Sequence, residues 1–273
     1  MIGIEFMSKL KTKIGIVGNG YVGKAFYNFF KNHYEVFIYD PAYILSNTKE
    51  DINKCDLAVV CVPTPENEDG SCNTTIVEES IRWIQTPLIL LKSTVEVGTT
   101  DRLIEKFKKD IVFSPEFAGE SKHWTPEAFT NDVKQTPFFI FGGKKELCYK
   151  IIEIYTPITG PSKTYRVTDP INAELAKYMV NTHLALKVAY CNEMYDLCNK
   201  LGTNYYEVRD LWLLDPRTTK SHTAVFTGER GFGGKCFPKD TKALAKLGDK
   251  VGMDLSILKA AIVSNDKMLK LNE

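Results

Sequence analysis

A glycine-rich loop that carries one cysteine has the clearest chemical potential in the sequence. Four glycines fall within seven residues, 228–234, which lets the backbone bend tightly and approach a ligand closely. Cys236 lies between Lys235 and Lys239, and Pro238 favours a helix start just beyond it. A thiol at a helix N-terminus beside lysines has its thiolate form favoured, and the thiolate is the nucleophile. The alternative is a buried, inert cysteine that packs as a small hydrophobic residue.

A second candidate is the GxGxxG motif formed by Gly18–Gly23. A short apolar strand (13–17) precedes it, a helix is expected after it, and a second strand (35–39) ends in Asp40. In this context the first two glycines allow the turn and bring the backbone near a pyrophosphate, and the third lets helix and strand pack closely. Asp40 can accept hydrogen bonds from ribose hydroxyls, and no arginine follows it, so the pattern predicts NAD rather than NADP. The alternative is an ordinary βαβ turn without a ligand.

Polar residues follow three further apolar strands, where ligands bind in open α/β sheets. Pro63-Thr64-Pro65 ends the first of these strands, and Ser93 and Thr94 follow the second. The two hydroxyls could equally serve loop and capping chemistry. Glu116 and Glu120 follow the third strand and are candidates for a general base and a water-positioning group. As isolated acids they would be solvated.

The second half of the chain places a lysine and an amide on one helix face. Asp169-Pro170 is a helix start signal, and residues 173–201 contain neither Gly nor Pro, which predicts one long helix. Lys177 and Asn181 are four residues apart and share a face of that helix. Such a pair can polarise a carbonyl or hold an oxyanion. The alternative is a solvated face.

The elements that must position these residues alternate between strand and helix up to about residue 155, with the last strand expected at 138–143. This pattern predicts an α/β fold: a Rossmann-type, doubly wound, mostly parallel sheet followed by an all-helical domain entered through the long helix. Further helices are expected over residues 205–212, 239–251 and 254–270. We expect an N-terminal extension over 1–11, part of it a cloning remnant, an NAD-binding domain over 12–168, and a helical central and dimerisation domain over 169–273.

Composition excludes several classes of function. The 35 basic and 34 acidic residues give a net charge of +1, so no global field favours nucleic acid or an anionic membrane. The seven cysteines are odd in number and form no CxxC pair, which argues for reduced thiols in the cytoplasm and against a disulfide framework or a zinc site. No apolar run approaches the roughly 18 residues of a membrane span, and the N-terminus lacks the apolar core of a signal peptide. We therefore expect a cytoplasmic protein without a metal.

Taken together, these residues resemble the UDP-glucose/GDP-mannose dehydrogenase family over about residues 12–270. The cysteine loop from Gly231 to Asp240 is the most specific part of the resemblance. The other motifs that carry it are GxGxxG with Asp40, Val62-Pro63-Thr64-Pro65, Lys92-Ser93-Thr94-Val95, Pro115-Glu116-Phe117, Ala173-Glu174-Leu175 with Lys177 and Asn181, and Asp215-Pro216-Arg217.

The resemblance implies NAD-dependent, four-electron oxidation of a nucleotide sugar, with UDP-glucose to UDP-glucuronate favoured, as in polysaccharide biosynthesis. Two NAD would be used in succession, and Cys236 would hold the sugar first as a thiohemiacetal and then as a thioester. The implied cofactor-binding residues are Gly18, Asn19, Gly20, Tyr21, Val22, Gly23, Asp40, Val62, Pro63, Thr64, Ser93, Thr94 and Lys239.

The resemblance also assigns roles around the sugar. Lys177 and Asn181 would stabilise oxyanions, Glu116 would be the base for thioester hydrolysis, and Thr94 with Asp240 would hold a water that helps to deprotonate the alcohol. Glu120 and Lys239 would support this network. The implied substrate-binding residues are Glu116, Phe117, Glu120, Lys177, Asn181, Arg217, Phe232 and Gly233. A homodimer through the long helix is also implied.

Two departures from the family pattern leave questions open. Family members usually continue into a third, UDP-binding domain, which we do not expect in a sequence that reaches Glu273 just after the helical domain. A fragment, a partner that supplies the lid and a reduced form are all compatible with this. The stretch 218–230 is also a few residues longer than usual, so either Arg217 or Arg230 could supply the arginine that reaches a neighbouring subunit in the family.

Two other functions compete. A two-electron dehydrogenase resembling the 3-hydroxyacid and 6-phosphogluconate group would use a lysine and an asparagine spaced like Lys177 and Asn181 and would need no cysteine. A lidless NAD-binding or assembly module would have no activity.

Overall fold

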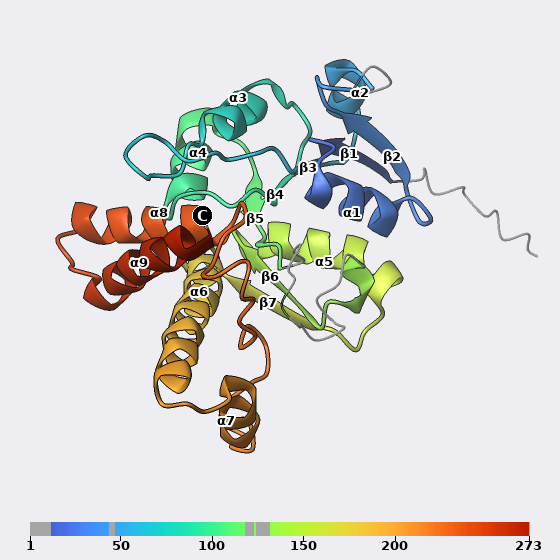
Figure 1. Cartoon of the computed structure of the whole chain (residues 1–273). Helices are drawn as coiled ribbons and strands as arrows, with labels where there is room; N and C mark the ends of the chain where they lie inside the picture. Colours follow the sequence, from blue (N-terminus) through green and yellow to red (C-terminus); the bar gives the residue numbers. More distant parts are fainter. Residues whose placement is uncertain (1–11, 44–46, 118–122, 124–131, 273) are drawn as a thin grey trace, which may run out of the picture.

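One seven-stranded sheet organises the first part of the chain in the computed structural model, which describes residues 12–43, 47–117, 123 and 132–272 (Figure 1). The strand order is β2-β1-β3-β4-β5-β6-β7. β1 to β5 pair in parallel, β6 is antiparallel to β5, and β7 is parallel to β6. The strands are β1 (Lys13–Val17), β2 (Glu35–Tyr39), β3 (Leu57–Val60), β4 (Ile89–Leu91), β5 (Ile111–Phe113), β6 (Phe138–Gly142) and β7 (Thr164–Thr168). The predicted mostly parallel sheet is confirmed.

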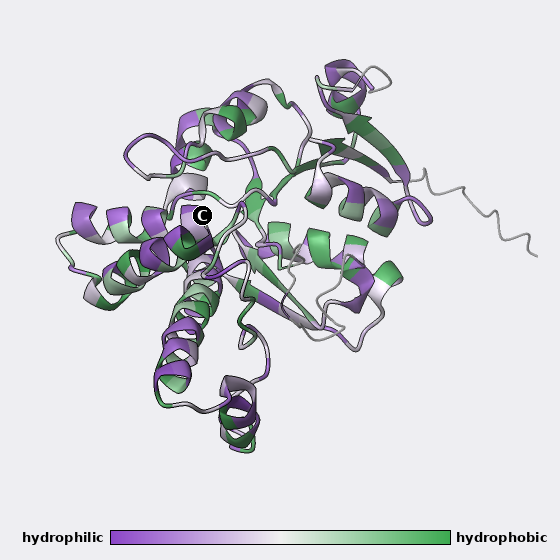
Figure 2. Ribbon diagram, viewed as in Figure 1, coloured by the Kyte–Doolittle hydropathy of each residue, from purple (hydrophilic) through white to green (hydrophobic). Residues whose placement is uncertain are grey.

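Helices cover both faces of the sheet, which makes the fold doubly wound. The helices of this part are α1 (Tyr21–Phe30), α2 (Lys49–Asn53), α3 (Thr75–Trp83), α4 (Thr99–Phe107) and α5 (Lys145–Thr159), with the short 3-10 helix η2 (Val133–Gln135). On one face, Phe26 of α1 and Ile151 of α5 pack with Ile16 and Val59. On the other face, α2, α3 and α4 pack on alternate strand residues such as Val60. Burial on both faces explains the near-continuous apolar strands, which appear as green arrows in Figure 2.

Besides the two described 3-10 helices, the sequence prediction missed one strand and one helix. The strand at 138–142 is not the last of the sheet, because β7 follows it. β7 lies at the sheet edge and alternates exposed and half-buried residues, so it lacks the apolar run by which the inner strands were found. Helix α2 has five residues and starts with a capping box formed by Thr48 and Asp51. It is too short to show a helical period.

The second part of the chain is helical, as predicted. It contains α6 (Pro170–Lys200), α7 (Tyr205–Trp212), α8 (Phe237–Lys250), α9 (Ser256–Leu269) and the 3-10 helix η3 (Lys270–Asn272). α8 and α9 lie beside α6, and α7 lies at its far end (Figure 1). The N-terminal end of α6 meets the sheet at Gly142, where a Cβ atom would stand 2.8 Å from Pro170 Cα. One helix therefore connects the sheet to the helical part. Among the described residues, no helix is both long and apolar enough to cross a bilayer.

Candidate active site

The glycine turn between β1 and α1 has the geometry expected for a pyrophosphate. Gly18 has φ +97°, and a Cβ there would lie 2.7 Å from the Cys61 carbonyl oxygen. A Cβ on Gly23 would lie 1.9 Å from the Gly18 carbonyl oxygen, so only glycine lets the helix pack this closely. A Cβ on Gly20 would meet nothing within 4 Å. The N-terminus of α1 therefore faces open space with a backbone that a phosphate can approach.

Asp40 is fixed beside this turn. One of its carboxylate oxygens accepts the Asn19 backbone N–H at 2.7 Å, and the other accepts the Ala42 N–H at 2.9 Å. Asp40 directly follows β2, and Tyr21 and Val22 form the first turn of α1. The structure thus brings the predicted cofactor residues of the first βαβ unit together, and this geometry fits an NAD molecule.

The loops after β3 and β4 are tied to each other by hydroxyl groups. Ser93 Oγ donates to the Val62 carbonyl at 2.7 Å, and Thr64 Oγ1 donates to the Thr94 carbonyl at 2.7 Å. Pro63 lies between Val62, whose carbonyl accepts, and Thr64, whose hydroxyl donates. The predicted residues of these loops therefore lie side by side, and the Ser93 and Thr64 hydroxyl protons serve the loop structure.

A chain of buried polar groups links α6 to the start of α8. Lys177 Nζ donates to Asn181 Oδ1 at 3.2 Å, and Asn181 Nδ2 donates to Asp240 Oδ2 at 2.6 Å. Lys239 Nζ donates to the other Asp240 oxygen at 2.7 Å. Lys177, Asn181 and Asp240 are buried. The solvated-face alternative for Lys177 and Asn181 is therefore wrong, because α8 covers this face of α6.

Cys236 lies one helical turn before Asp240, at the N-terminal end of α8. It is the N-cap residue of α8, and its carbonyl accepts the Asp240 N–H at 2.9 Å. Of the seven cysteines, all within described residues, six are buried or half-buried and Cys236 is exposed. Cys236 is therefore not a buried cysteine. Burial lowers the pKa of Lys177, and the nearby Asp240, Cys236 and Glu116 act in the opposite direction.

Glu116 approaches the same cluster from the end of β5. It is 9% exposed, forms an ion pair with Lys92 at 3.3 Å, and accepts the Phe117 N–H at 3.0 Å. Lys177 Nζ lies 5.1 Å from the centroid of the Phe117 ring. The sheet edge and α6 therefore meet at Glu116, Phe117 and Lys177. Glu120 lies outside the described residues.

Lys92 was part of a sequence motif but had no predicted role. It is 2% exposed, and its ammonium group also donates to Ser114 Oγ and the Pro115 carbonyl, each at 3.1 Å. Burial lowers the pKa of Lys92, while Glu116 acts in the opposite direction. A lysine directly after the buried strand β4 was the sequence signal for a specific anionic partner.

Other predicted substrate residues lie further from this cluster or inside the protein. Phe232 is buried among α6 and α9 residues, and Gly233 is exposed on the loop. Arg217 is exposed and pairs with the neighbouring Asp215 at 2.5 Å. Arg230 is buried and pairs with Asp196 of α6 at 2.9 Å. Among the described residues, neither arginine hydrogen-bonds to Lys177, Asn181 or Asp240.

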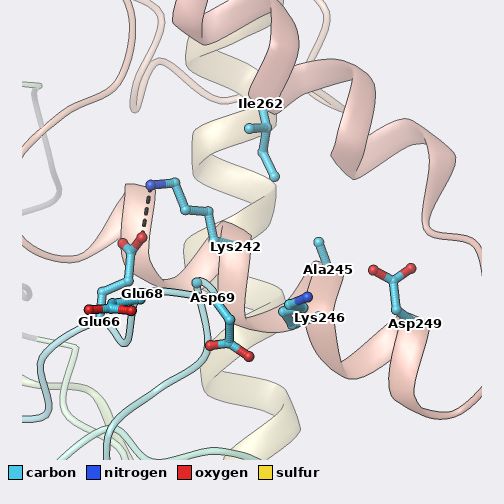
Figure 3. A pocket seen from close by; sticks show the side chains of 9 residues that line it. Glu66, Glu68, Asp69, Lys242, Ala245, Lys246, Asp249 and Ile262 are labelled. Carbon is cyan, nitrogen blue, oxygen red and sulfur yellow. Dashed lines mark hydrogen bonds and ion pairs between the residues drawn. The ribbon is translucent and has the colours of Figure 1, made fainter.

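A surface hollow lies elsewhere, between the loop after β3, α8 and α9 (Figure 3). It is lined by Glu66, Glu68, Asp69, Gly70, Lys242, Ala245, Lys246, Asp249 and Ile262. None of these is a predicted catalytic or cofactor residue. The candidate site is therefore the cluster around Cys236 and not this hollow.

Comparison with known proteins agrees with these observations. Residues 40–159 match the NAD binding domain of the UDP-glucose/GDP-mannose dehydrogenase family, and residues 171–267 match the central domain of the same family. UDP-glucose 6-dehydrogenase from Rickettsia prowazekii is 31% identical over 221 residues, which is 77% of this chain and 49% of that protein. UDP-glucose 6-dehydrogenase TuaD from Bacillus subtilis is 29% identical over 230 residues, 79% of this chain and 47% of that protein. The chain thus spans about half the length of these relatives.

Solved structures share the fold. A UDP-glucose dehydrogenase from Pyrobaculum islandicum superposes with a TM-score of 0.81 at 24% identity, covering 97% of this chain and 70% of that one. The 3-hydroxyisobutyrate dehydrogenase of Mycobacterium tuberculosis gives a TM-score of 0.65 at 15% identity, covering 94% of both chains. With both domain matches in chain order, and with the glycine turn and Asp40 in place for the cofactor NAD, the chain belongs to the UDP-glucose/GDP-mannose dehydrogenase family.

Proposed function

We propose that this chain oxidises the 6-hydroxyl of a nucleotide sugar to a carboxylate in a four-electron reaction. UDP-glucose is the favoured substrate. The observation that carries the proposal is the position of Cys236. It is an exposed thiol at the start of α8. It lies one helical turn before Asp240, which is hydrogen-bonded to Asn181 and, through Asn181, to Lys177. A two-electron dehydrogenase needs no nucleophile at this place, whereas a four-electron oxidation needs one to hold the aldehyde.

NAD, when bound, accepts the electrons of both oxidations. The turn from Gly18 to Gly23 would hold its pyrophosphate, and Asp40 would accept from its ribose hydroxyls. Val62, Thr64, Ser93 and Thr94 would line the path toward the sugar, because they follow the neighbouring strands β3 and β4.

Asp240 is suited to receive the alcohol proton through a water. Donors from Asn181 and Lys239 hold both of its carboxylate oxygens, so its orientation is fixed before a substrate arrives. We propose that Thr94 and Asp240 hold this water between them, and that Lys239 stabilises the carboxylate.

The sulfur of Cys236 would then add to the aldehyde carbon, and the carbonyl π bond would become an oxyanion. Lys177 has ammonium protons beyond the one it gives to Asn181, and it would donate one to the oxyanion. After the second oxidation a thioester remains on Cys236. Water attacks its carbon and loses one proton to Glu116 and the other to solvent. The C–S bond breaks, Cys236 keeps the sulfur as a thiolate, and the sugar is released as a carboxylate.

The test is the amount of NADH formed per UDP-glucose consumed by the purified chain. The proposal predicts two, and Cys236→Ser should stop net formation of the sugar acid. Cys198→Ala removes a thiol from α6 and should retain the value of two. One NADH, unchanged in Cys236→Ser, would instead support the two-electron alternative, for which the contact between Lys177 and Asn181 is the supporting observation. No NADH with any of UDP-glucose, GDP-mannose and UDP-N-acetyl-hexosamines would support an NAD-binding module.

We also propose a homodimer through α6. Several large apolar side chains on α6 are exposed, namely Leu175, Met179, Val180, Tyr190 and Leu197. Arg217 is exposed, whereas Arg230 is used inside the chain, so Arg217 is the arginine available to a second subunit. Sedimentation equilibrium tests this: a single species at the mass of one chain, at all concentrations, would contradict it.

A further inference from the structure

The backbone of the cysteine loop is bonded to the helical part by asparagine side chains. Asn265 of α9 forms two of these bonds with one residue: its Oδ1 accepts the Phe232 N–H at 2.6 Å, and its Nδ2 donates to the Phe232 carbonyl at 3.0 Å. Asn272 of η3 bonds in the same way to Arg230, with distances of 2.7 and 3.0 Å. Each amide thus satisfies both backbone groups of its partner, as a neighbouring β-strand would.

A third asparagine, Asn192 of α6, holds the residue between these two. Its Oδ1 accepts the Gly231 N–H at 3.2 Å and also the Arg230 Nε–H at 2.7 Å. The Arg230 guanidinium further donates to the Asn192 carbonyl at 3.2 Å and to Asp196 at 2.9 Å. Asn192, Asn265 and Arg230 are 2%, 3% and 8% exposed. Three consecutive loop residues are therefore fixed by three elements of the helical part. The Asn192 and Asn265 side chains are buried, whereas Asn272 is exposed.

Gly231 shows that the fit is close. Its φ is +78°, in the left-handed region that favours glycine, and a Cβ atom there would stand 2.5 Å from Asn265 Oδ1. The loop and Asn265 are thus matched to each other in shape as well as in hydrogen bonds.

Beyond Phe232 the chain crosses exposed glycines, one of which, Gly234, has φ +76°. It then reaches Cys236, whose carbonyl is held by the first turn of α8. The segment that carries the sulfur is therefore held at both ends, by the Asn265–Phe232 hydrogen bonds before it and by α8 after it.

We propose that Asn265 is a positioning residue for Cys236: its two hydrogen bonds to Phe232 hold the loop so that the sulfur captures the sugar aldehyde before the aldehyde leaves. This inference rests on the proposed function. It separates the two oxidations, because the first needs no sulfur. When the anchor is lost, the alcohol is still oxidised, and part of the aldehyde leaves as its hydrate without forming a C–S bond.

The first experiment compares Asn265→Ala with the unaltered chain at full conversion of a limiting amount of UDP-glucose. NADH per sugar should fall from two toward one, and the missing acid should appear as aldehyde trapped by hydroxylamine. The ratio is counted per sugar consumed, so a smaller folded fraction cannot change it. Leu258→Ala, which shortens another buried α9 side chain and leaves Asn265 in place, should lower the thermal midpoint and keep the ratio at two. A ratio of two in Asn265→Ala would overturn the proposal.

A second variant and a second measurement keep the proposal testable in other outcomes. If Asn265→Ala does not fold, Gly231→Ala disturbs the same contact from the loop side and should lower the ratio in the same direction. If the unaltered chain forms no NADH, the proposed function fails, and alkylation of Cys236 by iodoacetamide, followed by peptide mass spectrometry, tests the positioning by itself. The alkylation rate should differ several-fold between Asn265→Ala and the unaltered chain, because the loop no longer holds the sulfur in one place at the start of α8. Equal rates in the two proteins would overturn the positioning role.

Discussion

Two of the contacts between the sheet and the helical part differ in their access to water. At the first, Glu174 of α6 is fully buried and accepts three hydrogen bonds from the start of α4. The donors are the Gly98 N–H at 2.5 Å, the Thr100 N–H at 2.8 Å and Thr100 Oγ1 at 2.6 Å. A side chain from α6 therefore caps a helix of the sheet part.

At the second place, lysines of α8 face acids of the sheet part. Lys242 pairs with Glu66 at 2.9 Å, at the hollow in Figure 3, and Lys250 pairs with Glu96 at 3.2 Å. The lysines are eight residues apart and share one side of α8. Their side chains are 44% and 70% exposed.

The two ends of the candidate site are therefore held by different forces. Lys177 and Asn181 lie within two turns of Glu174 on α6, where hydrogen bonds are shielded from water. Cys236 begins α8, which is bonded to α6 through Asp240 and Asn181 but whose charged side exchanges its ion pairs with solvent and salt. The oxyanion side of the site should therefore be the rigid one, and the cysteine side should depend on its own loop anchors.

The largest effect is expected from Glu174→Ala. It leaves three buried donors without their acceptor, and the cost of each unmade hydrogen bond predicts a loss of about 3 kcal/mol or more in the free energy of unfolding. Urea unfolding measures it, with Glu96→Ala from the exposed contact as the matched control. A loss no larger than that of the control would mean that the Glu174 contact stabilises the fold no more than the exposed Glu96 contact does.

A somewhat smaller effect is expected from Gly142→Ala, where α6 meets β6. The added Cβ would stand 2.8 Å from Pro170 Cα and 2.9 Å from Ala173 Cβ, so the helix must shift. Overpacking of this kind costs about 1–3 kcal/mol. Gly20→Ala adds the same methyl group where no atom lies within 4 Å and should leave urea unfolding unchanged. Equal midpoints for the two variants would contradict a tightly packed joint.

The pH dependence of the unfolding free energy should follow the pKa shift of Glu174. Burial raises the pKa of Glu174, and the bonds from Thr100 and Gly98 act in the opposite direction. Because the folded pKa lies above the unfolded one, the contribution of this group is fully present below the unfolded pKa, about 4, and is lost as pH rises through the folded pKa. The difference in unfolding free energy between the unaltered chain and Glu174→Gln should therefore shrink as pH rises through this window. A growing difference would mean that the hydrogen bonds outweigh desolvation.

The fold and the cofactor side of the site could be predicted from sequence, because the patterns that indicate them are local. The apolar inner strands, GxGxxG with Asp40, and the i, i+4 pair of Lys177 and Asn181 each lie within one element or one turn. These gave the fold and located the cofactor side. The cysteine motif likewise placed Cys236 at the start of a helix.

The partners of these residues could not be predicted, because they come from separate elements. Lys92 and Glu116 meet only after β4 and β5 pair, and Asn192 and Asn265 are ordinary polar residues within their helices. Arg230 could equally have reached a second subunit. Its buried place depends on bonds to both α6 and η3, which no local pattern records.

The smallest effect is expected at the α8 contact. Lys242→Ala should cost about 0.2–1 kcal/mol, as exposed ion pairs generally do. The double-mutant cycle with Glu66→Ala isolates the pair, and its coupling energy should fall toward zero as salt is raised from about 0.01 to 1 M, because the Debye length shrinks from about 30 to 3 Å. The loss caused by Glu174→Ala should hardly change over the same range, since its partners are neutral donors inside the protein. If the coupling between Lys242 and Glu66 stayed constant with salt, this contact would be as shielded as that of Glu174, and the cysteine end of the site would be as firmly held as the oxyanion end.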